Sequence, residues 1–476
     1  MIGNDRGFYR NVFTLALPIA AQSLITIGVN MLDTIMVGAL SETALSATSL
    51  ANSFISIYQI FCMGLGMGAS VLVSRYYGMK RAGTDPAVVS GEIKDRSDLS
   101  GSDIVGKAEH ALRQTVSLML RLTILLAAVF ALATALAPEL LMRMYTEDAT
   151  IIEAGAVYFR WSVAAYFFLG VSLTTTIALR SVRQVRLPLI VSIGAFFVNL
   201  LANYTFIFGK FGAPRLEIAG AALGTLISRI FEASLIVGYL FLKDREIAFR
   251  PRHLFMKTGS LIGEYIRICV PVLISDGILA IGNNTVAMVI GHLGKTFVAA
   301  NAITAVTQQL STVVVQGVSQ SGAIVTGQTL GSGDRDKAMR QGHLFFRLGI
   351  GLGTISALFI ILMKNPIIAS YASVGEETRA IAGQLMVAIS FIIVFRATNS
   401  IMTKGVLRGG GDTAMLMITD NIFLWTVSIP LGLLAGFVFR LPPFWIYVCL
   451  KSDDILKTIW SYLRLRSGKW IKRIHA

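Results

Sequence analysis

Two stretches of this 476-residue chain decide its fold. Residues 18–38 read PIAAQSLITIGVNMLDTIMVG, and residues 271–291 read PVLISDGILAIGNNTVAMVIG. Each is an apolar run long enough to cross a bilayer as a single helix. Both begin with proline and end with glycine, and Asn30 of the first stretch stands at the position of Asn283 in the second. The chain therefore contains a repeated membrane-spanning segment.

The repeat extends beyond these two stretches. Residues 18–78 align with residues 271–331 without a gap, at a constant offset of 253 residues. The offset falls to 227 residues where Ala111 aligns with Ala338, so the first half carries 26 extra residues between Met79 and His110. Self-similarity at a fixed spacing indicates an architecture built from repeated units.

Apolar segments recur along the whole chain. Hydrophobic residues make up 54% of the sequence and charged residues only 14%, whereas a soluble domain carries about 25% charged residues. Backbone groups in hydrocarbon must be paired internally, which favours helices. The predicted helices are residues 11–38, 44–76, 115–137, 155–180, 188–209, 219–242, 262–291, 296–330, 342–364, 379–404, 414–438 and 442–463. We therefore predict an all-α polytopic membrane protein with about 12 transmembrane helices.

These helices divide into two lobes of six. The first lobe comprises residues 1–242, with a cytoplasmic loop insertion at about 79–110, and the second comprises residues 243–476 and ends in a basic cytoplasmic tail. An even number of helices gives both lobes the same orientation, which predicts a pseudo-twofold axis along the membrane normal. In transporters with such repeats the substrate site lies between the halves.

Basic residues lie mainly in alternate connections between the helices. One set of connections carries about four times as many Lys and Arg residues as the other, and the positive-inside rule makes the richer set cytoplasmic. Both termini are therefore expected in the cytoplasm, and the protein is expected to pass several times through the lipid bilayer. Because the net charge of +15 reflects this topology, we expect no nucleic-acid partner.

The first predicted helix carries a polar stripe. Gln22, Thr26, Asn30 and Asp33 follow one another at spacings of four, four and three residues, so they share one helical face. Such a stripe lines either a cavity or a hydrogen-bonded seam between helices. A carboxylate inside a membrane helix is costly and marks a candidate functional site. Asp33 needs a cation, a proton or a cage of donors.

The fifth predicted helix carries Asn199 and Asn203, four residues apart and on one face. Their amide oxygens beside the Asp33 carboxylate would suit a small cation such as Na⁺, and the same amides would equally cage a protonatable Asp33. A purely structural pair is the alternative. In the repeat Asp33 aligns with Val286, so we expect ion coupling in the first lobe.

The second lobe has polar candidates of its own. Asp276 and Asn283 are seven residues apart on one face of the seventh helix, and Asp420 lies near the start of the eleventh. Each acid is either functional or an ordinary interfacial residue. The eighth and tenth helices add residues expected to face a central cavity: Gln309, Thr312, Gln316, Gln320, Arg396 and Asn399. In the sixth helix, Arg229 and Glu232 are three residues apart and are expected to neutralise each other.

The sequence contains no recognisable enzyme motif. It has no P-loop, and its five histidines lie near loops without clustering. Cys62, Cys269 and Cys449 lie in apolar stretches and predict neither a disulfide framework nor a metal site. We expect no enzymatic activity, no cofactor apart from Na⁺ or H⁺ as coupling ion, and a monomer.

Several motifs resemble the multidrug and toxic compound extrusion (MATE) transporters. They are LDTIMVGAL at 32–40, LSATSLANS at 45–53, IFGKFGAPRLEIAGAALGTLISR at 207–229, VLRGGGDT at 406–413 and RSGKWIKRIH at 466–475. The resemblance covers nearly the whole chain, and it implies a protein of the bacterial inner membrane. It also implies two six-helix lobes around a cavity that opens alternately to each side, with antiport driven by a cation gradient.

The resemblance also implies roles for particular residues. In prokaryotic members an acid of the first helix binds the coupling Na⁺ or H⁺, and Asp33 matches it within DTIMVG. Asn199 and Asn203 match the contributing residues of the fifth helix, although some members carry a second acid where this chain has Asn203. In the tenth helix, Arg396 and Asn399 stand in place of the acids that some members carry.

The favoured function is secondary active antiport, in which small amphipathic or cationic molecules are exported in exchange for Na⁺ or H⁺. The alternative is a lipid-linked saccharide flippase of the same broad superfamily, a task that favours a cationic cavity for a pyrophosphate. A third hypothesis is a channel or a non-transporting scaffold, which the two-lobe repeat disfavours. A requirement of flux for an opposing ion gradient would separate the third hypothesis from the first.

Overall fold

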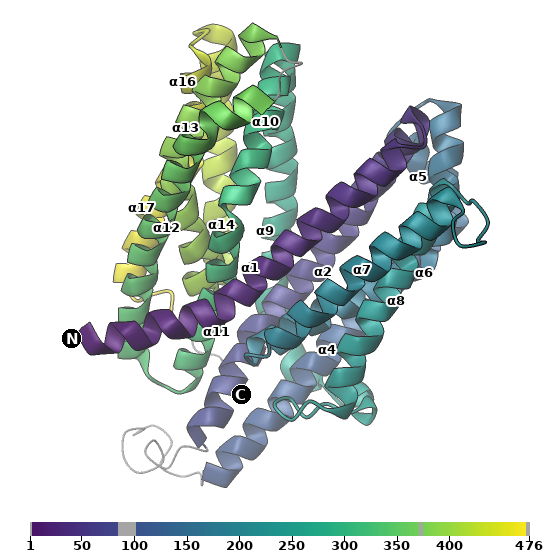
Figure 1. Ribbon diagram of the computed structural model, residues 1–476. Coiled ribbons are helices and arrows are strands. Elements are labelled where there is room, and N and C mark those ends of the chain that lie inside the picture. Colours follow the sequence, from purple (N-terminus) through teal and green to yellow (C-terminus); the bar gives the residue numbers. More distant parts are fainter. Residues whose placement is uncertain (1, 84–100, 371–374, 473–476) are drawn as a thin grey trace. The chain divides into compact units, whose positions relative to one another are not determined.

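The computed structural model describes residues 2–83, 101–370 and 375–472, which are almost entirely helical (Figure 1). The elements are α1 (Ile2–Gly38), α2 (Glu42–Gly83), α4 (Gly101–Leu136), α5 (Pro138–Arg143), α6 (Ala149–Ser181), α7 (Arg186–Phe208), α8 (Ile218–Leu242), η1 (Pro251–Phe255), α9 (Gly259–His292), α10 (Lys295–Ser311), α11 (Val313–Gly331), α12 (Arg335–Ser370), α13 (Glu376–Ser400), η2 (Ile401–Leu407), α14 (Thr413–Phe423), η3 (Leu424–Ser428), α15 (Ile429–Leu433), η4 (Leu434–Val438), α16 (Pro443–Leu450) and α17 (Ser452–Arg466). The element η1 is a 3₁₀-helix, whereas η2, η3 and η4 are π-helical turns that continue α-helices.

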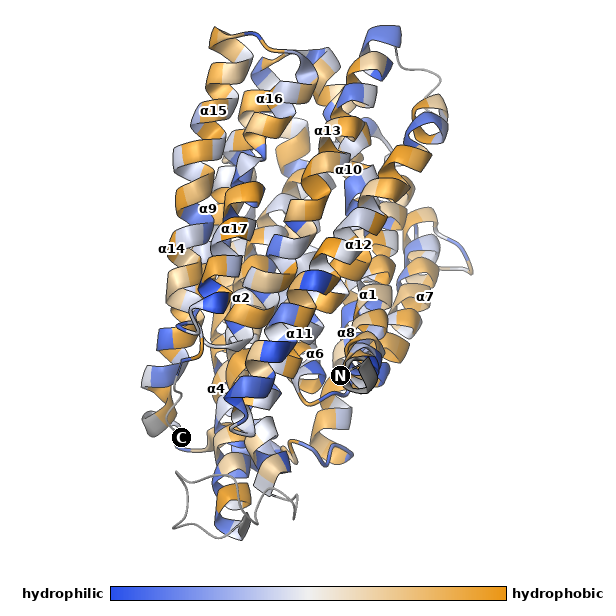
Figure 2. Cartoon of the chain, turned by 90° about the vertical axis from the view of Figure 1, so that its left-hand side faces the viewer, coloured by the Kyte–Doolittle hydropathy of each residue, from blue (hydrophilic) through white to orange (hydrophobic). Residues whose placement is uncertain are grey.

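Most of these helices are long and apolar enough to cross a membrane. Within the described ranges ten single spans meet this criterion, and the bent pair α10–α11 forms an eleventh. The pair α16–α17 follows as a broken helix that is interrupted at Lys451. Figure 2 shows hydrophobic residues along the long helices. The prediction of an all-α polytopic membrane protein with about twelve helices is confirmed.

The helices form two compact units. The C-terminal unit contains Met1–Ala20, Gly78–Ile104 and Val270–His475, and the N-terminal unit contains Ala21–Tyr77 and Val105–Cys269. Helices α1, α2, α4 and α9 each contribute residues to both units. The lobe boundary between residues 242 and 243 and the pseudo-twofold axis stay predictions.

Aromatic contacts hold the middle of the N-terminal unit together. Tyr58 of α2 is fully buried and donates a hydrogen bond of 2.7 Å to the carbonyl oxygen of Tyr166 in α6. The two rings meet edge to face with centroids 5.2 Å apart, an arrangement that aromatic pairs favour. Phe130 of α4 packs against both rings. These contacts fasten α2, α4 and α6 to one another.

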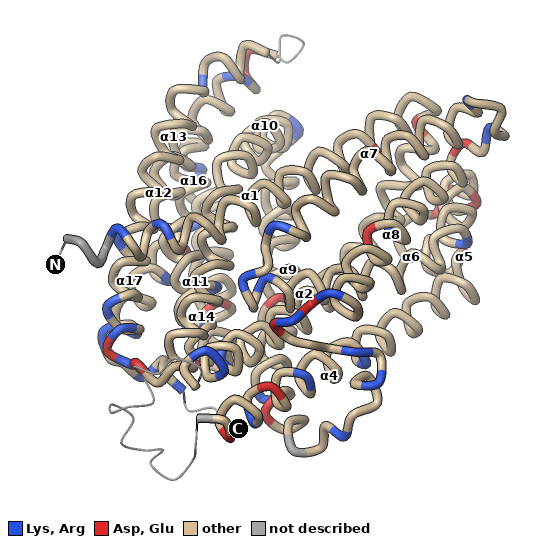
Figure 3. The backbone as a smooth tube through the Cα atoms, turned by 60° about the horizontal axis from the view of Figure 1, so that its bottom comes forward, with Lys and Arg blue, Asp and Glu red and all other residues tan. Residues whose placement is uncertain are grey.

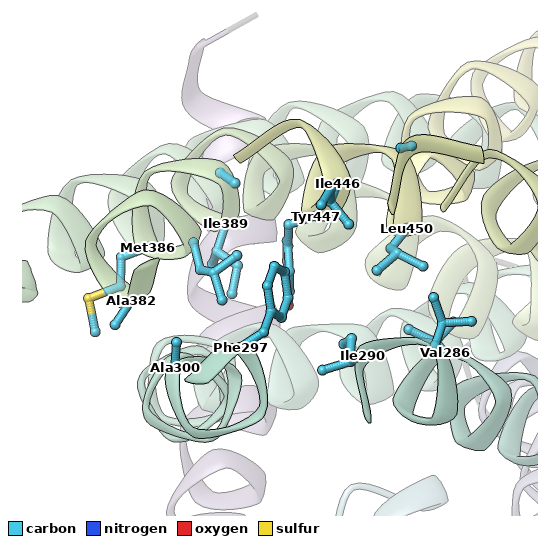
Figure 4. Packing of buried hydrophobic residues seen from close by; sticks show 14 of the residues in the cluster. Val286, Ile290, Phe297, Ala300, Ala382, Met386, Ile389, Ile446, Tyr447 and Leu450 are labelled. Atoms are coloured by element: carbon cyan, nitrogen blue, oxygen red, sulfur yellow. The ribbon is translucent and has the colours of Figure 1, made fainter. Parts of the chain in front are cut away.

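The C-terminal unit has its own apolar core, which joins α9, α10, α13 and α16 (Figure 4). Phe297 and Tyr447 are its aromatic members, and Leu450 of α16 is fully buried there. Val286, which occupies the repeat position of Asp33, is only 2% exposed in this core. The frame of the first span is therefore repeated, but apolar packing replaces the carboxylate.

The predicted eighth helix, residues 296–330, is wrong as one continuous helix. It breaks at Thr312 into α10 and α11, which are bent by 47° relative to each other. The hydroxyl groups of Ser311 and Thr312 donate to the carbonyl oxygen of Gln308 at 2.9 Å and 3.0 Å. Ser356 of α12 donates to the carbonyl oxygen of Ser311 at 2.9 Å. Such side-chain bonds compete with the helical ladder and bend helices.

The predicted eleventh and twelfth helices are also irregular. Pro430 cannot donate a backbone hydrogen bond, and the π-helical turn η3 ends two residues before it. Lys451 leaves the helical conformation between α16 and α17, with φ −122° and ψ 16°. π-Helical turns and broken membrane helices frequently mark functional sites.

Both ends of the loop insertion predicted at residues 79–110 are helical in the structure. Residues 79–83 continue α2 and residues 101–110 belong to α4, so the described part of this range is helical. Residues 84–100 lie outside the described residues, as do the last residues of the predicted basic tail.

The connection that follows α8 is fastened to α4. Arg121 of α4 donates to the carbonyl oxygens of Leu254 and Met256, the latter at 2.6 Å. Gln114 donates to the carbonyl oxygen of Lys257 at 2.7 Å, and Ser117 donates to that of Leu254 at 3.1 Å. The connection is therefore held through its backbone.

Candidate functional site

A cavity of about 590 Å³ lies within the N-terminal unit. Side chains of α1, α2, α6 and α8 line it, among them Asp33, Asn52, Tyr158, Thr225 and Arg229. Small-molecule sites are typically concavities of roughly 300–1,000 Å³ with a few convergent polar groups. This cavity is therefore the candidate functional site.

Asp33 lies in the wall of this cavity and is held by an asparagine of α7. The Nδ2 atom of Asn203 donates a hydrogen bond of 2.6 Å to Oδ1 of Asp33. The same Nδ2 lies 3.3 Å from Oδ1 of Asn199, which accepts a second hydrogen bond. Both asparagines are buried, because they follow each other by four residues on the inner face of α7. The structure thus brings together the three residues that were predicted to form an ion site.

The carbonyl oxygen Oδ1 of Asn203 is buried and has no hydrogen-bond partner among the described residues. Gly224 of α8 faces this amide so closely that a methyl group added there would overlap Oδ1 and lie 3.0 Å from the Asn203 backbone nitrogen. The glycine therefore permits the close approach of α7 and α8, which Figure 1 shows side by side. A buried carbonyl oxygen that receives no hydrogen bond can accept one from a protonated carboxyl group, or it can coordinate a small cation.

Arg229 carries positive charge into the same cavity. Its Nη1 atom lies 2.8 Å from Oε2 of Glu232, and the two residues form an ion pair within α8. The mutual neutralisation predicted from their spacing is therefore present. The charge of Arg229 also acts on Asp33. Glu232 thus holds an arginine that lines the same cavity as Asp33.

The other residues of the first-helix stripe have different surroundings. Gln22 is buried, donates to Ser192 Oγ at 2.7 Å and accepts a hydrogen bond from Arg180, so it forms a seam between helices. Thr26 returns its hydroxyl to the carbonyl oxygen of Gln22 at 3.0 Å. Asn30 lies in the cavity wall with Asp33. The stripe therefore serves as a seam at one end and as a cavity wall at the other.

Several predicted polar residues of the second half have partners of their own, and the central cavity that they were expected to face stays a prediction. Asp276 pairs with Arg408 at 3.5 Å, and Asn399 donates to Asp454 at 3.3 Å. Asn283 is exposed on α9. Gln309, Thr312, Gln316 and Gln320 do not share one continuous face, because the bend at Thr312 separates them.

Several cavity residues and buried acids were not predicted from the sequence. Tyr158 and Asn52 line the cavity, with the tyrosine hydroxyl 3.5 Å from Oδ1 of Asn52. Neither residue has an unusual sequence context. Asp453 and Asp454 of α17 are also buried. The signal available for them was a lysine, Lys457, four residues after Asp453.

The donor set at Asp33 limits how a metal ion could be held. Across the described ranges of the chain, no three His, Cys, Asp or Glu side chains are grouped as metal ligands. A Na⁺ ion at Asp33 would therefore depend on amide, hydroxyl or water oxygens besides one carboxylate. Hard oxygen ligands of this kind suit a weakly held, exchangeable cation.

Comparison with known proteins decides the family. The sequence model of the MatE family matches residues 18–84, 99–205 and 271–434, which together make up more than half of the chain. The chain belongs to the MATE family of efflux transporters. Over 470 residues this MATE protein is 25% identical to the probable multidrug resistance protein NorM of Thermotoga maritima, covering 98% of this chain and 93% of the relative.

Two further comparisons agree with this membership. The MATE protein is 26% identical to the multidrug resistance protein NorM of Burkholderia vietnamiensis over 433 residues, which cover 89% of this chain and 86% of that one. The crystal structure of the Vibrio cholerae MATE transporter VcmN in its bent form superposes with a TM-score of 0.82 and covers 98% of this chain and 99% of VcmN. At 17% sequence identity, the likeness to VcmN shows the fold alone.

Proposed function

We propose that this MATE protein is a secondary active antiporter that exports small amphipathic or cationic compounds in exchange for Na⁺ or H⁺. One observation carries the proposal. Asp33 lies in the wall of a polar cavity inside a membrane-spanning unit, where Asn203 holds it at 2.6 Å and Glu232 engages the neighbouring arginine. The names of the multidrug resistance relatives support the same class of substrate.

In the proposed cycle the state of Asp33 decides what the cavity holds. The ionised carboxylate favours a cationic substrate, since opposite charges attract strongly where little water is present. A proton or Na⁺ that arrives from the outer side neutralises Asp33 and lowers the affinity for that substrate. A transporter can use an ion gradient only if ion and substrate bind with unequal affinity to its conformations. In the proposed cycle the ion and the substrate compete for one carboxylate in the cavity, that of Asp33.

The proposed setting is the inner membrane of a bacterium, with both termini in the cytoplasm and a monomer as the transporting form. The excess of Lys and Arg in alternate connections of the sequence supports this orientation, and Figure 3 shows Lys and Arg residues in several of the connections. The basic connections predicted to be cytoplasmic follow the positive-inside rule.

The test uses purified protein in proteoliposomes that carry a fluorescent cationic dye. Asp33→Asn removes the charge and nearly preserves the shape, and we expect it to abolish dye transport driven by either a Na⁺ or a pH gradient. Asp148→Asn is the control, because Asp148 is an exposed helix cap outside the cavity. Equal reconstitution of both variants shows intact insertion. Full gradient-driven transport by Asp33→Asn would overturn the assignment, and gradients of Na⁺ and H⁺ imposed separately identify the coupling ion.

A further inference from the structure

The connection between α8 and α9, residues 243–258, is rich in basic residues. It contains five Lys or Arg residues and two Asp or Glu residues. The helices on both sides qualify as membrane spans, from Ile218 to Leu242 and from Leu261 to His292, so the connection between them lies at one surface of the membrane. A basic segment at such a surface can interact with lipid head groups.

One of the two acids of this connection is used inside the protein. Asp244 is fully buried, and its carboxylate accepts backbone hydrogen bonds from Ile247 at 2.9 Å and from Ala248 at 3.0 Å. It also accepts a hydrogen bond of 2.8 Å from the side-chain amide of Gln184. The negative charge of Asp244 is therefore directed inward. The exposed charged side chains of the connection are cations: Lys243, Arg245, Arg252 and Lys257.

An exposed phenylalanine lies beside one of these cations. Phe255 is 83% exposed and ends the 3₁₀-helix η1. Side chains three residues apart eclipse each other along a 3₁₀-helix, so Arg252 and Phe255 share one face. Between them, His253 turns toward the protein, and its ring meets that of the buried Phe249 with centroids 5.6 Å apart. The outward face of η1 thus combines a cation with an exposed aromatic ring.

The backbone under this face is fixed. Side chains of α4 donate hydrogen bonds to the carbonyl oxygens of Leu254, Met256 and Lys257. These carbonyl groups lie on both sides of Phe255, while Phe249 is fully buried before η1 begins. A ring presented on a fixed backbone loses little conformational entropy when it binds, which favours association.

We propose that the outward face of η1, together with Lys257, binds anionic phospholipid at the membrane surface. The proposal is independent of ion-coupled export. Aromatic rings favour the boundary between head groups and hydrocarbon, which suits Phe255. Each Lys or Arg near an anionic lipid surface strengthens binding about fivefold, which suits Arg252 and Lys257. Aromatic ring and cations together match a lipid that has both an acyl region and a negative head group.

The other end of α8 provides a matched comparison. The connection between α7 and α8, residues 209–217, also carries an exposed ring, that of Phe211 at 79% exposure, next to the exposed Lys210. Its second cation, Arg215, pairs with Glu217 at 3.4 Å. Both ends of α8 therefore present an aromatic ring, but the larger surplus of positive charge is at the η1 end. Anionic lipid should distinguish the two ends, whereas zwitterionic lipid should not.

The experiment identifies the lipid that contacts each ring. Phe255 or Phe211 is replaced by photoreactive p-benzoylphenylalanine in the full chain, which is reconstituted in nanodiscs with equal amounts of phosphatidylglycerol and phosphatidylcholine. Mass spectrometry after irradiation counts the crosslinks to each lipid. We expect the ratio of phosphatidylglycerol to phosphatidylcholine at position 255 to exceed that at position 211 about fivefold or more.

Charge variants then test the cations. Arg252→Gln combined with Lys257→Gln should lower the ratio at position 255 about tenfold or more, and Lys210→Gln should leave it unchanged. Arg252→Lys combined with Lys257→Arg keeps both charges and should preserve the ratio, which separates charge from altered folding. Equal ratios at positions 255 and 211, or no lipid crosslink at position 255, would overturn the proposal. Loss of the preference in excess inorganic phosphate at constant ionic strength would assign the cations to a soluble anion and overturn it as well.

Discussion

Gly224 lies directly against the amide of Asn203, so close that any side chain at position 224 would collide with the group that holds Asp33. The collision involves the backbone of Asn203 as well as its side chain, with a distance of 3.0 Å to the backbone nitrogen. Rotation of the amide would remove the overlap with Oδ1, but the tight contact with the backbone nitrogen would remain. The packing of α7 against α8 therefore helps to determine the geometry of the candidate ion site.

The first prediction concerns this contact. Gly224→Ala should displace Asn203 from Asp33 and reduce ion-driven dye efflux strongly, and overpacking of this kind should cost about 1–3 kcal/mol of stability. Gly238→Ala in the same helix is the matched control, because nothing lies within 4 Å of an added methyl group there. Efflux from proteoliposomes and the apparent melting temperature are measured for both. Unchanged efflux in Gly224→Ala would contradict the assigned role of Asn203.

The second prediction concerns the arginine that lines the same cavity. Glu232→Gln should free Arg229 from its 2.8 Å ion pair and let it neutralise Asp33 instead. We expect the efflux of a cationic dye to fall about tenfold, equivalent to about 1.4 kcal/mol. The double variant Arg229→Gln with Glu232→Gln should recover much of this loss, since no free arginine remains. Strictly additive losses in this double-mutant cycle would show that the two residues act independently.

The third prediction concerns stability at the end of the C-terminal unit. Arg464 contacts both carboxylate oxygens of Asp412, at 2.7 Å and 3.0 Å, and Lys472 contacts the same carboxylate at 3.4 Å. Asp412→Asn should lower stability by about 1–3 kcal/mol, because a charged hydrogen-bond acceptor inside the protein is lost. Arg160→Gln removes an exposed pair with Glu139 and should change stability by less than about 1 kcal/mol. Thermal unfolding in detergent measures both, and equal effects would contradict this reasoning.

The fourth prediction concerns pH and the connection after α8. Burial, followed by the charges of Arg113, Arg252 and Arg250, lowers the pKa of His253 below its ordinary value of 6.5. Below pH 6.5 the unfolded chain therefore binds a proton more readily than the folded chain does. The stability contributed by neutral His253 is complete above that value and is lost as the pH falls toward the lower folded pKa.

His253→Gln should reduce this dependence. The apparent melting temperature of the wild type should fall more than that of the variant between about pH 7.5 and about pH 5.5. Glutamine can still accept the hydrogen bond that the Arg250 backbone N–H donates to His253 Nδ1 at 2.9 Å. Parallel curves for the two proteins would show that His253 does not titrate in this range.

Much of the fold could be predicted from the sequence, because apolar length and the internal repeat specify membrane helices directly. The bend at Thr312 could not, since it depends on hydroxyl bonds to Gln308 and on Ser356 of a distant segment. The π-helical turns likewise depend on packing around them, although Pro430 offers a local hint. Periodicity describes regular helices and carries no information about where tertiary contacts interrupt them.

The candidate site divides in the same way. Asp33, Asn199 and Asn203 could be predicted because a lone acid and a pair of amides at helical spacing are conspicuous in apolar segments. Tyr158 and Asn52 could not, because tyrosine and asparagine are ordinary residues in helices α6 and α2. Gln22 shows the limit of prediction from helical spacing most clearly. It shares the polar stripe of the first helix with Asn30, but its side chain bonds to Ser192 and Arg180.

The connection between α8 and α9 is attached through its carbonyl oxygens, while the attaching side chains belong to α4. Carbonyl oxygens are the same whichever amino acid bears them. Substitutions at Leu254, Met256 and Lys257 should therefore leave these acceptors in place, as long as the backbone path is kept. The attachment depends instead on the side chains of Arg121 and Gln114, which lie about 130 to 140 residues earlier in the chain. The sequence of the connection itself does not reveal this dependence.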